Sequence, residues 1–248
     1  MEDQFPPEPA NLLAKKSFPW VGTIIFVIVL AMIGAFSWKV YHYYRGIQDG
    51  TLNVDQVFAS TRPSTEAAVA ALAAQAKGSG SLATNDDPML GSATAALTIV
   101  EFGDFGCPFT KSESYVMHAL AIKFPKQIRF IYRDFPLEEL HPGSTLAADA
   151  GYCAHQQGKF WEYSEQVYSR GDLTEAGIAS IAQDIGLDLP ALADCLADPA
   201  TDEEVQGDLA DGYAAKVVGT PTFFINGERI EGAIPFDIFV QIVQAFNP

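Results

Sequence analysis

A single cysteine, Cys107, stands where the chain changes from an expected strand to an expected helix. The segment VEFGDFGCPFTKSESYV (Val100 to Val116) is first apolar and β-branched, then turns at two glycines, then becomes helical. Unpaired backbone N–H groups at a helix start stabilise negative charge, and a cysteine there ionises more readily than a free one. Pro108 suits the first helical position, where no N–H is needed. This placement favours a reactive thiolate over a buried structural cysteine.

The position three residues after Cys107 holds Thr110, so the motif reads Cys-x-x-Thr. A threonine hydroxyl can donate a hydrogen bond to a thiolate but cannot form a disulfide. Attack by the lone thiol would give a mixed disulfide that an external thiol must resolve. Peroxide-reducing thiol enzymes use the opposite order, Thr-x-x-Cys. The order Cys-x-x-Thr in this chain therefore argues against that class.

The other cysteines and one proline leave alternatives open. Cys153 and Cys195 lie on apolar helical faces, and the sequence alone allows either free thiols or any of the three pairings that three cysteines can form. Pro221, in VGTP, precedes an expected strand, where a residue without an N–H marks an edge or a strand start. Only about 5–6% of X–Pro bonds are cis, so a trans bond is the default expectation there.

The elements that must position these residues alternate between strands and helices. The order strand–helix–strand, helical region, hairpin, helix predicts a small mixed sheet with helices on both faces. Asn226-Gly227 is a strong hairpin-turn signal. The expected elements are a strand at Leu97–Phe102, a helix from Cys107 to about Lys123 with Val116, Ala119, Leu120 and Lys123 on one face, a half-buried strand at Gln127–Phe135, helices within about 141–218, the hairpin Thr220–Gly232 and a helix at Pro235–Phe246.

An uncharged segment near the N-terminus predicts a single membrane anchor. No residue from Ser17 to Trp38 is charged, and a helix needs about 20 residues to cross a bilayer core. The segment is too long for a cleaved signal peptide, and it has no polar stripe as a buried helix would. We therefore expect a tail at 1–17, a transmembrane helix at 18–40, and a stalk or linker at 41–88 whose alanine-rich part, Ser64–Lys77, is a candidate short helix.

Charge and histidine spacing exclude several function classes. The formal net charge is −16, and such acidity argues against nucleic-acid binding. The four histidines (His42, His118, His141 and His155) have no zinc-ligand spacing with the cysteines, and the chain has no Gly-rich phosphate loop. We expect no metal site and no cofactor.

Three segments together resemble the DsbA-like branch of the thioredoxin-fold superfamily. They are VEFGDFGCPFT, FPLEELHPGSTLAADAGYCAHQQGKFWEYSEQVY and VGTPTFFINGERIEG, and they occur in the order found in that family. The resemblance implies an α/β thioredoxin fold at residues 89–248, with a helical insertion at about 141–218. The family usually carries Cys-Pro-x-Cys, so Thr110 departs from its pattern and puts a dithiol oxidation cycle in doubt.

The resemblance also implies roles for individual residues. Cys107 would be the exposed nucleophile, Pro221 would be cis beside it, and Glu101 would be a buried carboxylate that assists proton transfer. Pro108, Phe109, Thr220 and Pro221 would contact the client, with the Thr220 backbone pairing with an extended substrate. Cys153 and Cys195 would form a structural disulfide. We interpret Asp104 as a loop or capping residue and His141 as a helix cap, with a catalytic role for His141 the less favoured alternative.

These expectations lead to one leading hypothesis and one alternative. The first is a membrane-anchored, single-pass thiol–disulfide oxidoreductase of the monothiol type, with its globular domain on the extracytoplasmic side. Its partners would be client proteins with thiols or disulfides, together with a membrane redox partner or a small thiol that resolves the adduct. The flanking lysines and arginines do not decide the orientation, whereas disulfide chemistry favours the outside. The alternative is a redox-inactive client-binding or scaffold module that keeps the thioredoxin-fold groove.

Overall fold

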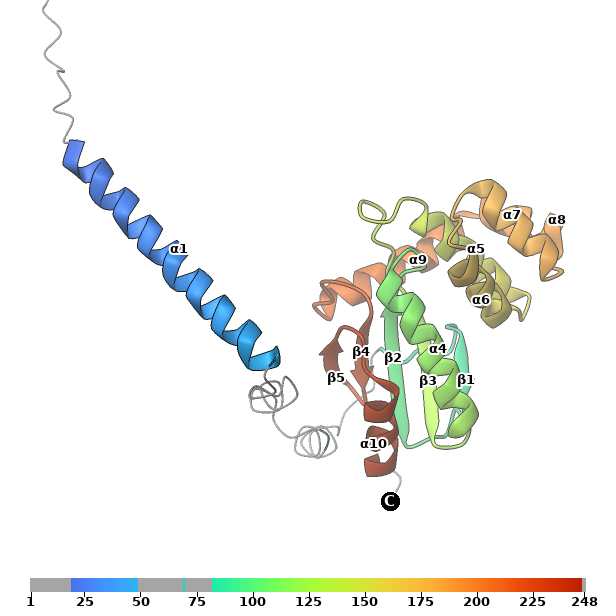
Figure 1. Cartoon of the computed structure of the whole chain (residues 1–248). Coiled ribbons are helices and arrows are strands. Elements are labelled where there is room, and N and C mark those ends of the chain that lie inside the picture. Colours follow the sequence, from blue (N-terminus) through green and yellow to red (C-terminus); the bar gives the residue numbers. More distant parts are fainter. Residues whose placement is uncertain (1–18, 49–68, 70–81, 247–248) are drawn as a thin grey trace, which may run out of the picture. The chain divides into compact units, whose positions relative to one another are not determined.

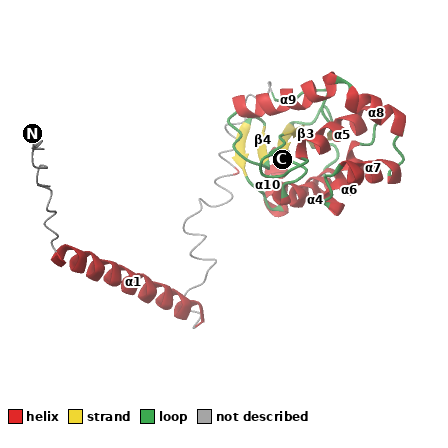
Figure 2. Ribbon diagram, turned by 90° about the horizontal axis from the view of Figure 1, so that it is seen from above, coloured by secondary structure: helices red, strands yellow, loops and turns green. Residues whose placement is uncertain are grey.

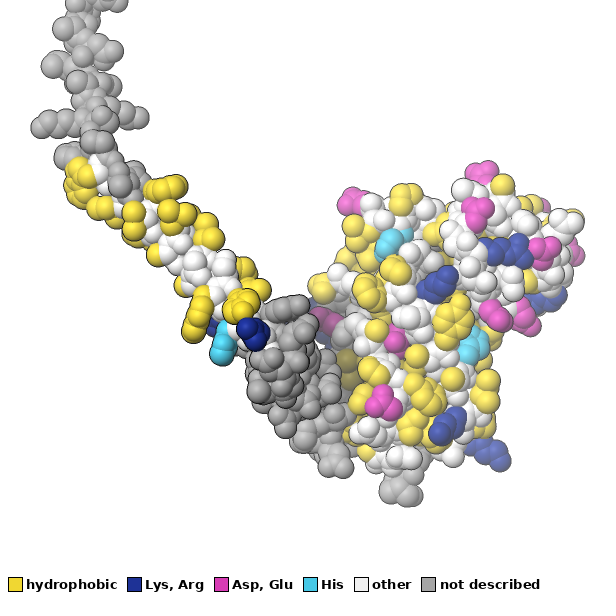
Figure 3. All heavy atoms as spheres, in the orientation of Figure 1, with side chains coloured by type: hydrophobic (Ala, Val, Ile, Leu, Met, Phe, Trp, Pro, Cys, Tyr) yellow, Lys and Arg dark blue, Asp and Glu magenta, His cyan; other side chains and the backbone are white. Residues whose placement is uncertain are grey.

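The computed structural model describes residues 19–48, 69 and 82–246, and the chain divides into two units, Met1–Pro63 and Ser64–Pro248 (Figure 1). The first unit contains α1 (Pro19–Gln48), along which apolar side chains such as Phe26 and Trp38 are exposed (Figure 3). Among the described residues, no helix combines the length and hydropathy that crossing a bilayer requires. Residues 41–48, expected in the stalk, continue α1. The alanine-rich helix expected at Ser64–Lys77 lies outside the described residues except for Val69, which is helical.

The second unit is built on a five-stranded sheet of order β1-β3-β2-β4-β5 (Figure 1). The central strands β2 and β3 are parallel and are joined by α4 (Pro108–Lys123), while the other neighbours are antiparallel. The two edges are short: β1 has three residues, and β5 is charged at three of its four positions. The strands are β1 (Met89–Gly91), β2 (Leu97–Gly103), β3 (Ile128–Asp134), β4 (Thr222–Ile225) and β5 (Glu228–Glu231).

Between β3 and β4 the chain forms the expected helical insertion. A disulfide between Cys153 and Cys195 joins α5 to α8, with an S–S distance of 2.06 Å. The hairpin is confirmed at Asn226 and Gly227, whose φ angles of 46° and 92° are those of a tight turn between β4 and β5. The remaining helices are α5 (Ser144–Gln156), α6 (Phe160–Arg170), α7 (Glu175–Asp184), α8 (Leu189–Ala197), α9 (Pro199–Ala214) and α10 (Phe236–Phe246).

Helices cover both faces of the sheet, with α9 on one side and α4 and α10 on the other (Figure 2). Alternate residues of β2 enter the two cores: Ile99 packs in the cluster that contains Phe239 of α10, and Val100 packs in the cluster that receives Leu209 of α9. Burial on both faces explains why Leu97–Gly103 reads as a nearly continuous apolar run.

The prediction that β3 is half buried is wrong. Six of its seven residues are buried, and Arg133 is only 4% exposed. The cause is α9, which covers this face and brings Asp208 and Asp211 to the guanidinium. Arg133 Nη2 donates to Asp211 Oδ2 at 2.9 Å and also to Asp208. A buried arginine on an apparently polar strand face is tolerated because these carboxylates neutralise it.

The segment before β1, expected to be the end of the stalk, packs against the domain. Asp87 Oδ2 lies 3.4 Å from Arg133 Nε, and the Tyr132 backbone N–H donates to the Pro88 carbonyl at 3.1 Å. The pKa of Asp87 is raised to about 8, first by burial and then by the neighbouring Asp208 carboxylate, while Arg133 acts in the opposite direction. The domain therefore includes residues that precede Met89.

Candidate active site around Cys107

Cys107 is the N-cap residue of α4, as the sequence predicts. Its backbone is extended (φ −79°, ψ 123°), and its carbonyl accepts the Lys111 N–H at 3.0 Å, the first bond of the helix. The Cys107 N–H in turn donates to the Asp104 carbonyl at 3.0 Å, which closes the turn after β2. The expectation that Cys107 is exposed is wrong: the residue is only 4% exposed, because the loop that carries Thr220 packs against its sulfur. A reaction partner therefore has to enter the site to meet the sulfur.

The loop before β4 provides the opposite wall of the site. Antiparallel pairing of β2 with β4 aligns Phe102 with Thr222 and so brings Thr220 and Pro221 beside Cys107. The Cys107 Sγ donates to the Thr220 carbonyl at 3.2 Å, across a sequence separation of 113 residues. The Thr220–Pro221 peptide bond is cis.

Pro108 and Phe109 lie on the exposed side of the site. Both side chains are exposed, and Phe109 reaches 62% exposure, which is high for an aromatic ring next to a buried sulfur. The four residues expected to contact the client thus occupy two places: Pro108 and Phe109 at the helix start, and Thr220 and Pro221 on the facing loop.

Thr110 is buried beneath Cys107, and its hydroxyl group stabilises the turn after β2. It is 1% exposed, and its Oγ1 accepts the Asp104 N–H at 3.4 Å. Its methyl group fills the space where a side chain on Gly103 would lie. Within the described part of the chain, Thr110 has no hydrogen bond to the Cys107 sulfur, and the Thr220 carbonyl takes that contact instead.

Two buried carboxyl groups lie behind the cysteine. Glu101 on β2 is 1% exposed and Glu113 on α4 is 3% exposed, and each has one oxygen without a hydrogen-bond partner among the residues that the structure describes. Burial raises the pKa of Glu101 well above its usual range, and the neighbouring Glu113 and Cys107 raise it further. Burial also raises the pKa of Glu113 to about 7, although the Ile234 backbone N–H works against this.

Sequence reasoning missed Glu113 because it assigned the wrong face of α4. The helix buries Thr110, Glu113, Met117 and Leu120, whereas the expected face was Val116, Ala119, Leu120 and Lys123. The spacing of the apolar residues Met117 and Leu120 could have identified the buried face of α4, because Glu113 lies one helical turn before Met117 on that face.

His141 lies beside the cysteine and is held by a buried aspartate. Its Nδ1 is 2.7 Å from Asp104 Oδ2, and that side chain has no exposed surface. Asp104 also accepts the Gly106 N–H at 2.7 Å and the Leu137 N–H at 3.0 Å. The interpretation of His141 as a helix cap is wrong, because Gly143 is the N-cap of α5. The aspartate is the loop residue that the sequence suggested.

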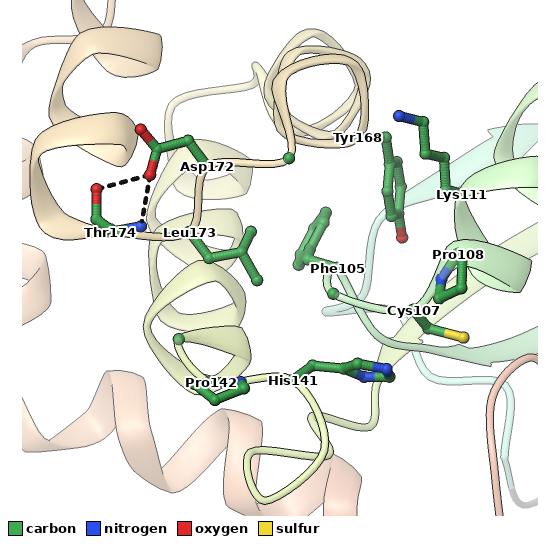
Figure 4. A pocket seen from close by; sticks show the side chains of 13 residues that line it. Phe105, Cys107, Pro108, Lys111, His141, Pro142, Tyr168, Asp172, Leu173 and Thr174 are labelled. Carbon is green, nitrogen blue, oxygen red and sulfur yellow. Dashed lines mark hydrogen bonds between the residues drawn. The ribbon is translucent and has the colours of Figure 1, made fainter.

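A groove of about 680 Å³ opens at the cysteine (Figure 4). It runs from Cys107 and Pro108 towards the loop after α6, where Leu173 and Thr174 line it. Its walls are mostly apolar, with the rings of Phe105 and Tyr168 at the centre. Lys111 and His141 line the groove as well, so an apolar path leads to a thiol that has basic groups nearby.

Comparison with known proteins places this geometry in a family. A family model described as thioredoxin matches residues 83–245. A thioredoxin-like oxidoreductase from Silicibacter pomeroyi DSS-3 is 26% identical and superposes with a TM-score of 0.60, over 66% of this chain and 93% of that one. BdbD from Bacillus subtilis is 22% identical, with a TM-score of 0.60 over 69% of this chain and 98% of that one, and shares the fold.

The curated relatives have a different overall organisation. The Na(+)/H(+) antiporter NhaA 1 of Salinispora arenicola (strain CNS-205) is 34% identical over 148 residues, which are 59% of this chain and 22% of the antiporter. The antiporter of Herminiimonas arsenicoxydans is 31% identical over 160 residues, or 64% of this chain and 25% of that one. This chain spans a quarter or less of these relatives, and the matches cover only the thioredoxin domain. With its sheet, its insertion and its helix-start cysteine, the chain belongs to the thioredoxin family, in the DsbA-like branch of the thioredoxin-fold superfamily.

Proposed function

We propose that this protein exchanges disulfides with client proteins through one nucleophilic thiol. We also propose that a membrane anchor holds its globular domain outside the cytoplasm. The observation that carries the proposal is the Cys107 sulfur at the start of α4, 3.2 Å from the carbonyl that precedes the cis proline, at the mouth of the groove. A helix start stabilises the thiolate, and the facing loop offers a backbone acceptor to an extended client.

The single thiol determines the kind of reaction. Cys107 attacks a client disulfide and forms a mixed disulfide. Thr110 stands where a second thiol would resolve that adduct from within. Cys153 and Cys195 are already bonded to each other. Release of the client therefore depends on a thiol from another molecule, either a small thiol or a membrane redox partner.

Glu101 is proposed to handle protons on the buried side of the site. Its raised pKa keeps a proton on a carboxyl group close to Cys107, and its Oε1 has no partner among the described residues. A neutral buried acid can exchange a proton with the Cys107 sulfur on its buried side.

The membrane anchor is proposed from the N-terminal sequence and from the exposed apolar side chains of α1, because the described part of this helix does not by itself meet the length and hydropathy of a membrane span. The uncharged segment Ser17–Trp38 matches a bilayer core in length, and side chains along it such as Phe36 are exposed. Residues 1–17 would then be cytoplasmic and residues 41–248 outside. External protease on intact cells should digest the globular domain, and protection of that domain until lysis would contradict this topology.

Covalent capture tests the exchange reaction. The protein is incubated with oxidised glutathione and analysed by intact mass and peptide mapping. One glutathione adduct should form on Cys107 and persist until a thiol is added, and Cys107→Ser should form none. Thr110→Cys should replace the persistent adduct by an internal disulfide.

Thr110 also supports the second candidate function, a redox-inactive module that holds clients in the groove. The same incubation separates the two functions. A wild-type protein that forms no adduct at any pH between 6 and 9, yet still binds unfolded protein, would exclude exchange and favour the binding module.

A further inference from the structure

We infer that His141, oriented by Asp104, is the proton acceptor and donor for sulfur chemistry in the groove. This inference rests on the proposed exchange reaction and assigns a residue to it. The arrangement comes from three separate segments: the turn after β2, the start of α4, and the loop before α5.

The first argument is the orientation of the imidazole. A carboxylate oxygen accepts hydrogen bonds only, so the 2.7 Å contact with Asp104 Oδ2 places a proton on His141 Nδ1. The neutral ring then has Nε2 as its free acceptor. A carboxylate fixes the tautomer of a catalytic histidine in the same way in other nucleophilic enzymes.

The second argument is the rigidity of the aspartate. Its two oxygens accept N–H groups from Gly106 and Leu137 in addition to the histidine. The loop that carries the histidine is held from its other end, because Glu138 accepts the Gly143 N–H at 2.7 Å and the Thr145 N–H at 2.9 Å. The imidazole is thus fixed through both the loop and the ring.

The third argument is proximity to the sulfur. A Cβ atom added to Gly106, the residue before Cys107, would lie 2.4 Å from the His141 Cβ, so the two segments are in direct contact. Figure 4 shows the imidazole and Cys107 on the same wall of the groove. The histidine side chain is 23% exposed, so unlike Glu101 it can exchange protons with groove solvent.

The resting state does not yet show the transfer. The thiol donates to the Thr220 carbonyl, so rotation of Sγ or one bridging water is needed to reach the imidazole. Catalytic hydrogen bonds are commonly longer before the reaction partner binds. The ionisable groups that face His141 across the groove or touch it directly are Cys107 and Lys111 from α4, Tyr168 from α6, Asp172 from the loop after α6, and Asp104.

The proton inventory of the exchange balances with this residue. Transfer from Cys107 to His141 gives a thiolate and an imidazolium. The thiolate attacks a client disulfide, one S–S bond forms and one breaks, and the departing client thiolate takes the imidazolium proton. Neutral His141 then takes the proton of an incoming thiol, whose sulfur attacks the client sulfur of the mixed disulfide. Cys107 leaves as a thiolate and takes the proton back from the imidazolium, so both residues return to their starting state. A disulfide and a thiol have been exchanged for another disulfide and thiol.

The experiment measures resolution separately from capture. Full-length wild type and His141→Ala are converted to the glutathione adduct on Cys107, and the release of glutathione disulfide on addition of reduced glutathione is followed from pH 6 to 9. We expect His141→Ala to slow release about 100-fold at pH 7, the lower end for removal of a general base. The defect should shrink above about pH 8.5, where free thiols ionise without help.

Chemical rescue distinguishes a base from a structural contact. Free imidazole should accelerate release in His141→Ala and leave the wild type unchanged. His155→Ala, a histidine outside the groove, is the matched control and should behave as the wild type. Normal release by His141→Ala, or a defect that imidazole does not relieve and that is constant with pH, would overturn the inference.

The outcome also separates this inference from the function on which it rests. If wild-type Cys107 forms no adduct, the exchange function fails and the role of His141 fails with it. If the adduct forms and is resolved equally well without His141, the exchange function stands and only the assignment of the base is lost.

Discussion

Replacing Glu113 by glutamine should make the stability of the domain less dependent on pH. In the folded state this carboxyl group is 3% exposed, and its Oε2 has no partner among the described residues. Burial raises its pKa from 4.5 to about 7. The folded state therefore binds this proton more tightly than the unfolded chain does. The stability that the protonated group contributes is fully present below pH 4.5 and is lost as the pH rises through about 7.

The size of the effect follows from the two pKa values. A rise from 4.5 to about 7 corresponds to about 3 kcal/mol, at about 1.36 kcal/mol for each pH unit. Glutamine keeps the shape and has no charge to bury, so it should escape this loss. The buried amide still needs hydrogen-bond partners, and any that are missing lower the free energy of unfolding by an amount that does not vary with pH.

Urea unfolding of the two proteins at pH 5 and at pH 8.5 measures the effect. At pH 5 their free energies of unfolding should agree within about 1 kcal/mol, and at pH 8.5 Glu113→Gln should be more stable by about 3 kcal/mol. Glu139→Gln removes the same charge from an exposed position and should show no such change between the two pH values. A difference between wild type and Glu113→Gln that stays constant with pH would refute the buried-carboxyl reasoning.

Three further changes test other parts of the structure. Replacing both Cys153 and Cys195 by alanine opens a link with a sequence separation of 42 and should lower the free energy of unfolding in urea by about 2–4 kcal/mol; an unchanged urea midpoint would contradict this. Arg133→Met leaves buried carboxylates without their cation and should cost about 3–5 kcal/mol. Arg229→Met removes a surface pair with Glu231 and an exposed hydrogen bond to the Lys216 carbonyl, and it should cost no more than about 1 kcal/mol in the same assay. Gly106→Ala should displace His141 and slow resolution of the glutathione adduct as His141→Ala does. A normal rate of resolution would show that contact between Gly106 and His141 is not needed for this step.

Local signals were sufficient for the parts of the fold that depend on neighbouring residues. The glycines before Cys107 and the proline after it predict the helix start, and Asn226-Gly227 predicts the hairpin. Strand β1 was missed because it has three residues and is held by its ladder with β3, which leaves no periodicity to read. Resemblance to a family, not spacing, suggested the disulfide that the structure contains between Cys153 and Cys195.

The features that sequence reasoning missed depend on contacts between distant segments. The burial of Arg133 results from α9, whose Asp208 lies 75 residues further along the chain. The Asp104–His141 contact spans 37 residues and replaces the expected helix cap. Arg133 and Asp104 lie in segments rich in aromatic and apolar residues, and their partners are determined by how distant segments pack rather than by any local pattern. A polar residue within an apolar segment predicts that a buried partner exists, but it does not predict which residue that partner is.

The two sheet edges bear on how a protein that handles unfolded chains avoids aggregating with them. An extended client can pair with any unpaired strand edge, and such pairing is how sheets recruit strands and begin fibrils. Here one edge, β1, ends after three residues, and the other, β5, carries Glu228, Arg229 and Glu231. Neither offers a long apolar template. In the exchange reaction proposed above, a captured client would therefore be kept from unproductive strand addition and would pair only with the short stretch of backbone beside Cys107, where pairing leads to chemistry and then to release.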